Sequence, residues 1–142
     1  MKRSAFSVIL LCLIALCISV TFCACKAERI EYYSQKENYI EATGTLTHVK
    51  YNEDASALYL GFSDLSYAFD DTCFKIIGDN LPIAQENGID SKAVLGEQAT
   101  FITAPRYFGD GYIMPIVAIY IDGECLLDFE TGYDNLMKWL SD

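Results

Sequence analysis

Histidine, the residue type that most often binds metals and acts as a general acid or base, is scarce in this sequence. Its 142 residues include a single histidine, His48, so a histidine-based metal cluster is excluded and histidine catalysis would depend on that one side chain. His48 alternates with Leu46 in a stretch of strand character, which favours a structural or exposed role. The sequence also lacks a calcium loop of the EF-hand type, a phosphate-binding glycine motif and a nucleophile elbow. We therefore expect neither an enzyme nor a bound metal or cofactor.

Acidic residues occur as adjacent pairs, Glu53-Asp54 and Asp70-Asp71. Neighbouring side chains in a strand point to opposite faces, so neither pair forms an acid–base dyad by itself. We interpret both pairs as solvated turn residues. A hydrolase that uses converging carboxylates is the less favoured alternative.

Basic residues are also few, with 10 Lys and Arg against 20 Asp and Glu, which gives a net charge of −10. Phosphate backbones and anionic lipid head groups bind proteins mainly through Lys and Arg. We therefore expect no nucleic-acid partner and no basic membrane-binding face. The acidity is interpreted as a feature that keeps the domain soluble, and weak binding of a cation or cationic partner is the alternative.

The one long apolar run lies at the start of the chain. Lys2 and Arg3 precede an apolar stretch over residues 5–22, and the run ends in Phe22-Cys23-Ala24-Cys25. A positive start, an apolar run and a small residue before the cut are the layout of a secretory signal peptide. The last four residues resemble the lipobox of bacterial lipoproteins, although that family usually has Leu where Phe22 stands. The resemblance implies cleavage before Cys25, acylation of its sulfur and attachment to the cell membrane.

Two alternatives to lipidation stay open. One is a plain cleaved signal; the other is an uncleaved anchor, because about 18 apolar residues can just span a bilayer. All three interpretations place residues 26–142 outside the cytoplasm. We expect a signal peptide over residues 1–24, a polar tether over 25–38 in which a short helix could form near 29–37, and a single domain over 39–142.

Cysteines are concentrated in the N-terminal segment, where Cys12, Cys17, Cys23 and Cys25 lie. Only Cys73 and Cys125 remain in the body of the chain. An exported protein can join such a pair in a disulfide, and burial of both as small apolar residues is the alternative. The pair lacks the CxxC spacing of redox catalysts.

From residue 39 onward, apolar and polar residues alternate in short runs that predict strands over residues 39–49, 57–62, 67–77, 99–104, 112–121 and 124–129. Gly44 suggests a bulge or bend, Pro115 an edge or a bulge, and Asp122-Gly123 a tight hairpin. A short helix with Asn80 as its cap and Gly88 after its end is expected, and a C-terminal helix is expected after a cap at Thr131.

Three strands, a short helix and two further strands are the element order of the OB-fold, a small barrel of five strands. The order therefore predicts a mainly-β domain, a small antiparallel OB-like β-barrel with an added strand and a C-terminal helix. An open antiparallel sheet covered by that helix would give the same order.

The stretch with the character of a binding site contains Arg106, Tyr107, Phe108 and Tyr112, between the predicted fourth and fifth strands. Aromatic side chains beside an arginine on a loop are suited to stacking and partner recognition. The alternative is that these rings belong to the core. We predict non-catalytic binding of a protein partner or a small envelope ligand, and a structural role in an envelope complex is the second possibility.

Overall fold

The computed structural model describes residues 2–70, 72–106 and 113–142, in two compact units that divide between Ser34 and Gln35. The first unit is one helix, α1 (Lys2–Ser34), which contains the expected signal segment and residues 25–34 of the expected tether. Among the residues that the structure describes, no helix combines the length and the apolar character needed to cross a membrane.

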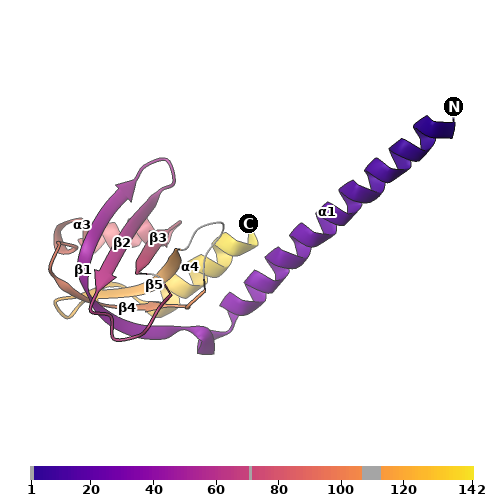
Figure 1. Ribbon diagram of the computed structural model, residues 1–142. Coiled ribbons are helices and arrows are strands. Elements are labelled where there is room, and N and C mark those ends of the chain that lie inside the picture. Colours follow the sequence, from indigo (N-terminus) through magenta and orange to yellow (C-terminus); the bar gives the residue numbers. More distant parts are fainter. Residues whose placement is uncertain (1, 71, 107–112) are drawn as a thin grey trace. The chain divides into compact units, whose positions relative to one another are not determined.

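The second unit is mainly β, as the sequence predicts, and contains a six-stranded sheet. Figure 1 shows these strands with the helices that accompany them. The elements are the short 3-10 helix η1 (Lys36–Asn38), strands β1 (Ile40–Asn52), β2 (Ala57–Ser63) and β3 (Cys73–Ile77), helices α2 (Asn80–Glu86) and α3 (Ile89–Lys92), strands β4 (Gln98–Thr103), β5 (Met114–Ile121) and β6 (Glu124–Leu127), and helix α4 (Phe129–Ser141). The sheet order is β3-β2-β1-β4-β5-β6, and β3 also pairs with β5 in parallel.

Strand β1 is long enough to pair with two neighbouring strands. Residues 40–45 pair with β4, and residues 45–52 pair with β2. Gly44 lies near the change of partner, where a Cβ would approach Leu65 Cδ2 to 2.8 Å and Phe62 Cβ to 3.1 Å. The register of β1 against β2 shifts between Leu46 and His48, so the irregularity predicted at Gly44 lies further along the strand.

The third predicted strand is wrong in its extent. It begins at Cys73 rather than at residue 67, because the preceding loop bonds to β1 instead of continuing the sheet.

The short helix predicted to end before Gly88 is confirmed as α2, and Gly88 adopts the left-handed φ of +91° after its end. Its N-cap is Asp79 rather than Asn80, and the helix α3 that follows is not predicted from the sequence.

The two expectations for β5 have different outcomes. Asp122 and Gly123 have φ angles of +53° and +75° and connect β5 to β6, which confirms the predicted tight hairpin. Pro115, expected at an edge or a bulge, is buried inside a strand that pairs with β4, β6 and β3, so the edge alternative is wrong. The pairing of β5 with β4 is irregular close by, where the register shifts opposite Ile102 and Thr103.

Helix α4 begins earlier than predicted. Its N-cap is Asp128 rather than Thr131, because the Asp128 Oδ1 accepts a hydrogen bond of 3.0 Å from the backbone N–H of Thr131. This backbone bond is the largest influence that lowers the pKa of the Asp128 carboxyl.

The core is organised around stacked aromatic rings. Phe62 and Phe101 stack with centroids 4.4 Å apart, and Phe74 lies 4.8 Å from Phe101. Aliphatic side chains from all six strands and from α2 and α3 surround these rings. Helix α4 packs on β5 at Gly132, where a Cβ would lie only 1.8 Å from the Val117 carbonyl oxygen.

Candidate functional site

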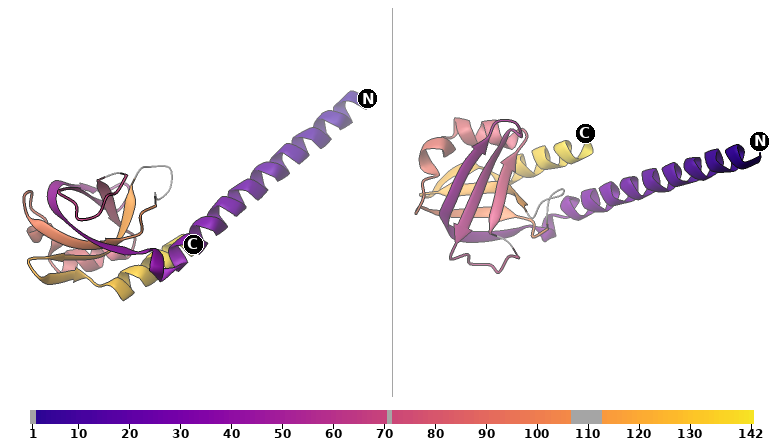
Figure 2. Two further views of the ribbon diagram at one scale, coloured as in Figure 1. Left: turned by 60° about the horizontal axis from the view of Figure 1, so that its bottom comes forward. Right: turned by 45° about the horizontal axis from the view of Figure 1, so that its top comes forward.

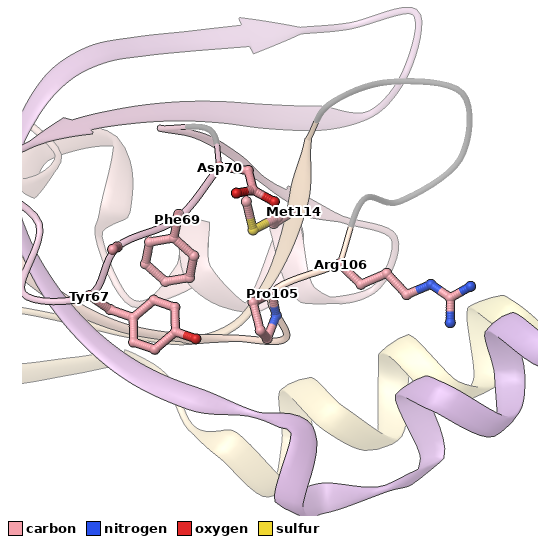
Figure 3. Close-up of a pocket in the computed structure, with 7 residues that line it drawn as sticks. Tyr67, Phe69, Asp70, Pro105, Arg106 and Met114 are labelled. Atoms are coloured by element: carbon pink, nitrogen blue, oxygen red, sulfur yellow. The ribbon is translucent and has the colours of Figure 1, made fainter.

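A cavity of about 340 Å³ lies where the loop before β3 meets the adjacent ends of β4 and β5. Figure 3 shows the side chains around it. Its lining residues come from three places in the sequence: Tyr67, Ala68, Phe69 and Asp70 from the loop, Pro105 and Arg106 after β4, and Met114 at the start of β5. Pockets of this size hold a small organic molecule or a side chain of a partner.

Backbone and side-chain hydrogen bonds to β1 hold the loop in place. The Ser66 N–H donates to the Thr43 carbonyl at 2.9 Å, and the Thr43 N–H donates to the Ser66 hydroxyl at 2.8 Å. Asp64 adopts a φ of +53°, which turns the chain out of β2 just before these bonds. The loop is therefore fixed at one end directly before Tyr67.

The loop forms an aromatic wall that rests on the core. The rings of Tyr67 and Phe69 are tilted against each other with centroids 4.7 Å apart. Phe69 in turn contacts Phe74 edge-on at 5.2 Å and is partly buried. Tyr67 is 42% exposed, so it presents a ring to solvent on a rigid support. Exposed rings held in this way are suited to stacking or cation–π recognition.

The opposite wall comes from β4 and β5. Met114 is buried and pairs with Phe74 across the parallel strands. The Thr103 hydroxyl donates a 2.6 Å hydrogen bond to the Pro115 carbonyl, which ties the two strands together at this end. In Figure 3 the Arg106 guanidinium extends away from the other labelled side chains. Asp70 and Arg106 are the charged residues among those that line the cavity.

The structure places only part of the predicted binding loop. Arg106 lines the cavity, while Tyr107, Phe108 and Tyr112 lie outside the described residues, as does Asp71. The sequence interpretation missed Tyr67 and Phe69 because residues 67–77 resembled one strand, and it missed Met114 because that residue lies within another predicted strand. Asp70 was interpreted only as a solvated turn residue. A signal was present in the polar, turn-forming residues Ser63, Asp64 and Ser66 just before Tyr67.

The structure does not bring Cys73 and Cys125 together as a disulfide would require. Cys73 precedes Phe74, which pairs with Met114 at the start of β5, whereas Cys125 pairs with Tyr120 near its end. Six residues of strand span about 20 Å, and bridged cysteines have Cα atoms less than about 7 Å apart. The pairing considered from the sequence is therefore wrong for this fold.

The remaining candidates have separate positions. His48 is exposed on β1 and lies against Gly61, where a Cβ would meet the His48 Cβ at 2.9 Å. Glu53 and Asp54 lie exposed in the turn between β1 and β2, and Cys25 is exposed on α1. Within the described ranges, His, Cys, Asp and Glu form no group of three or more that could hold a metal ion.

No protein-family model, no curated protein and no solved structure matches this chain.

Proposed function

We propose that this chain is a lipid-anchored, extracytoplasmic, non-catalytic protein that binds its ligand or partner in the cavity beside Tyr67. The observation that carries this proposal is the composition of the walls: two contacting rings, a methionine and a proline, with one carboxylate, Asp70, and one guanidinium, Arg106. Such walls bind the flat or apolar part of a ligand, and the two charged groups bind complementary polar or charged groups. The favoured occupant is therefore a partner's side chain or a small ligand that combines a flat apolar part with polar or charged groups.

We further propose that the sheet is an OB-like barrel. Strands β3, β2, β1, β4 and β5 are paired in succession, and the parallel pairing of β5 with β3 returns to the first of them. This ring of pairings, together with helices between β3 and β4, supports the barrel over the open sheet. In OB barrels the segment between strands four and five is a common binding element, and here Pro105 and Arg106 begin that segment.

Photo-crosslinking in cells tests whether a partner binds at the cavity beside Tyr67. A photoreactive phenylalanine at position 67 of the full chain should capture a partner that the same residue at position 139 does not. Trp139 is the matched control because it is 47% exposed, against 42% for Tyr67, and lies on α4. The captured product should decrease when Asp70→Asn is added.

A small ligand would leave no crosslinked protein. In that case, mass spectrometry of extracts from the purified full chain should detect a compound that Tyr67→Ala loses and Trp139→Ala retains. Equal capture from positions 67 and 139, or neither a partner nor a compound, would contradict binding at this cavity. A partner captured from position 139 alone would favour the structural role in an envelope complex.

A further inference from the structure

Lys36 of η1 lies over two aromatic rings of helix α4. Phe129 and Tyr133 are one helical turn apart on α4, and their rings stack with centroids 5.8 Å apart. The Lys36 ammonium nitrogen is 4.8 Å from the ring centroid of Tyr133 and 5.6 Å from that of Phe129. Both distances are within the range of a cation–π interaction. The left-hand view of Figure 2 shows α4, in yellow, beside the start of β1, which follows η1 in the chain.

A carboxylate and a third ring complete this arrangement. The Lys36 ammonium donates a hydrogen bond of 2.5 Å to Glu130 Oε2, which raises the pKa of Lys36 above its ordinary value. The ring of Tyr39 contacts the rings of Phe129 and Tyr133 edge-on, with centroids 5.6 Å and 5.7 Å away. Aromatic faces together with a carboxylate are the groups by which proteins bind an ammonium ion.

Lys36 can leave these rings while the rings keep their positions. The side chains of Lys36 and Glu130 are 48% and 69% exposed, so water competes for both charges and the ion pair contributes little to stability. The three rings are half-buried and contact one another, and two of them belong to the same helix, so their arrangement does not require the lysine. Lys36 is therefore a replaceable occupant of a preformed site.

We propose that Tyr39, Phe129, Tyr133 and Glu130 form a binding site for an external primary ammonium group, with Lys36 as its intramolecular competitor. A primary ammonium donates to Glu130 as Lys36 does, whereas a quaternary ammonium has no N–H to donate. The group comes from a lysine of a partner protein or from a small amine. When it binds, Lys36 leaves the rings and η1 loses its ion pair with α4.

The surroundings of the site favour a cation over a neutral ligand. Besides Glu130, the carboxylate of Asp134 also acts on the Lys36 ammonium and raises its pKa. The net charge of the chain, −10, attracts small cations and basic segments to its surface. The site shares no residue with the cavity beside Tyr67, so this inference stands independently of the proposed function.

An NMR titration of the isotope-labelled full chain in nonionic detergent tests the inference. The probe is butylammonium, which has the same chain and head group as a lysine side chain, and butanol is the neutral control. Butylammonium should shift the backbone amides of Phe129 and Tyr133. In the wild type it should also shift those of residues 36–38, because Lys36 is displaced. Lys36→Ala should bind butylammonium about five-fold more tightly, because the competing occupant is absent.

Lys138→Ala is the matched control for the loss of a positive charge. Lys138 is also an exposed lysine in an ion pair, with Asp79 at 2.8 Å, so its removal changes the net charge equally without emptying the site. In the Lys36→Ala background, Tyr133→Leu and Glu130→Gln should each weaken binding about three-fold, the effect of losing one ring face or one exposed ion pair.

A terminally blocked peptide with a single lysine distinguishes the two sources of the ammonium group. Tighter binding than that of butylammonium would assign the site to a partner protein, and equal or weaker binding would assign it to a small amine. The inference is wrong if Lys36→Ala gains no affinity, if Lys138→Ala gains as much, if Glu130→Gln binds unchanged, or if butanol causes equal shifts. Circular dichroism checks the fold of each variant, and because Glu130 is exposed, its variant decides the question even if Tyr133→Leu unfolds.

Discussion

At the residue scale, Gly132 sets the distance between helix α4 and the sheet. A Cβ at this position would lie 1.8 Å from the Val117 carbonyl oxygen, so even alanine forces the helix away from β5. We expect Gly132→Ala to lower the free energy of unfolding by about 2 kcal/mol, because overpacking outweighs the gain of about 1 kcal/mol in helix propensity. Urea denaturation measures the change. Asp134→Ala, an exposed change on the same helix, is the control, and an equally stable Gly132→Ala variant would contradict this packing.

Asp128 makes the stability that the N-cap of α4 contributes depend on pH. Its carboxylate accepts the Thr131 N–H, which holds the pKa of Asp128 below the ordinary value of 3.8. A carboxyl group whose pKa is lowered by folding stabilises the protein above its unfolded pKa, and this contribution is lost as pH falls through the folded pKa. Asp128→Ala should therefore cost about 1 kcal/mol near pH 7 and less near pH 3.

The matched variant for that experiment is Asp128→Asn, which still accepts the hydrogen bond but cannot ionise. It should keep most of the stability near pH 7 and show a weaker decline in acid than the wild type. Denaturant unfolding at both pH values provides the comparison. A difference between wild type and Asp128→Ala that is the same at both pH values would show that the charge contributes nothing.

At the scale of elements, Asn80 joins α2 to α4. Its buried amide donates from Nδ2 to the Gly132 carbonyl at 2.9 Å, and its Oδ1 accepts from Asn135 Nδ2 at 3.0 Å. Asn80→Ala leaves the Gly132 carbonyl and the Asn135 amide without these bonds and should lower the free energy of unfolding by about 1–3 kcal/mol. Asn38→Ala, at the partly exposed end of η1, is a weaker control, and equal effects in the two variants would contradict the role of Asn80 in joining α2 to α4.

The elements that the sequence predicts well have their determinants close together in the chain. The β1–β2 and β5–β6 hairpins follow from alternation and turn residues, as Asp122-Gly123 shows with two positive φ angles. Strand β3 was placed too early because the start of its loop depends on hydrogen bonds between Ser66 and Thr43, which are far apart in sequence. The cap at Asp128 was missed because Thr131, which donates to it, is itself a good capping residue.

The same reasoning explains what the sequence indicates about the candidate site. The aromatic residues beside Arg106 in the sequence indicate that it belongs to a binding site, and Arg106 does line the cavity. Tyr67, Phe69 and Met114 reach that cavity only through the placement of the loop and the parallel pairing of β3 with β5. Long-range pairing of this kind leaves no local pattern in the sequence. Local patterns therefore cannot predict that these residues line one cavity.

At the scale of the whole molecule, the acidic body and the N-terminal segment lead to one prediction about location. Residues 25–142 hold 8 basic and 20 acidic residues, a balance that opposes binding to anionic lipids, so we expect membrane attachment through the acyl chains proposed at Cys25. In a bacterial host, the wild type should incorporate a labelled fatty acid and fractionate with membranes, and Cys25→Ser should lose the label. Cys23→Ser is the matched control, since Cys23 is also exposed on α1 but does not follow the small Ala24.

Retention of the label in Cys25→Ser would contradict acylation at this cysteine. Membrane fractionation of both variants without any label would instead favour the uncleaved anchor, because a peptide anchor does not depend on either sulfur.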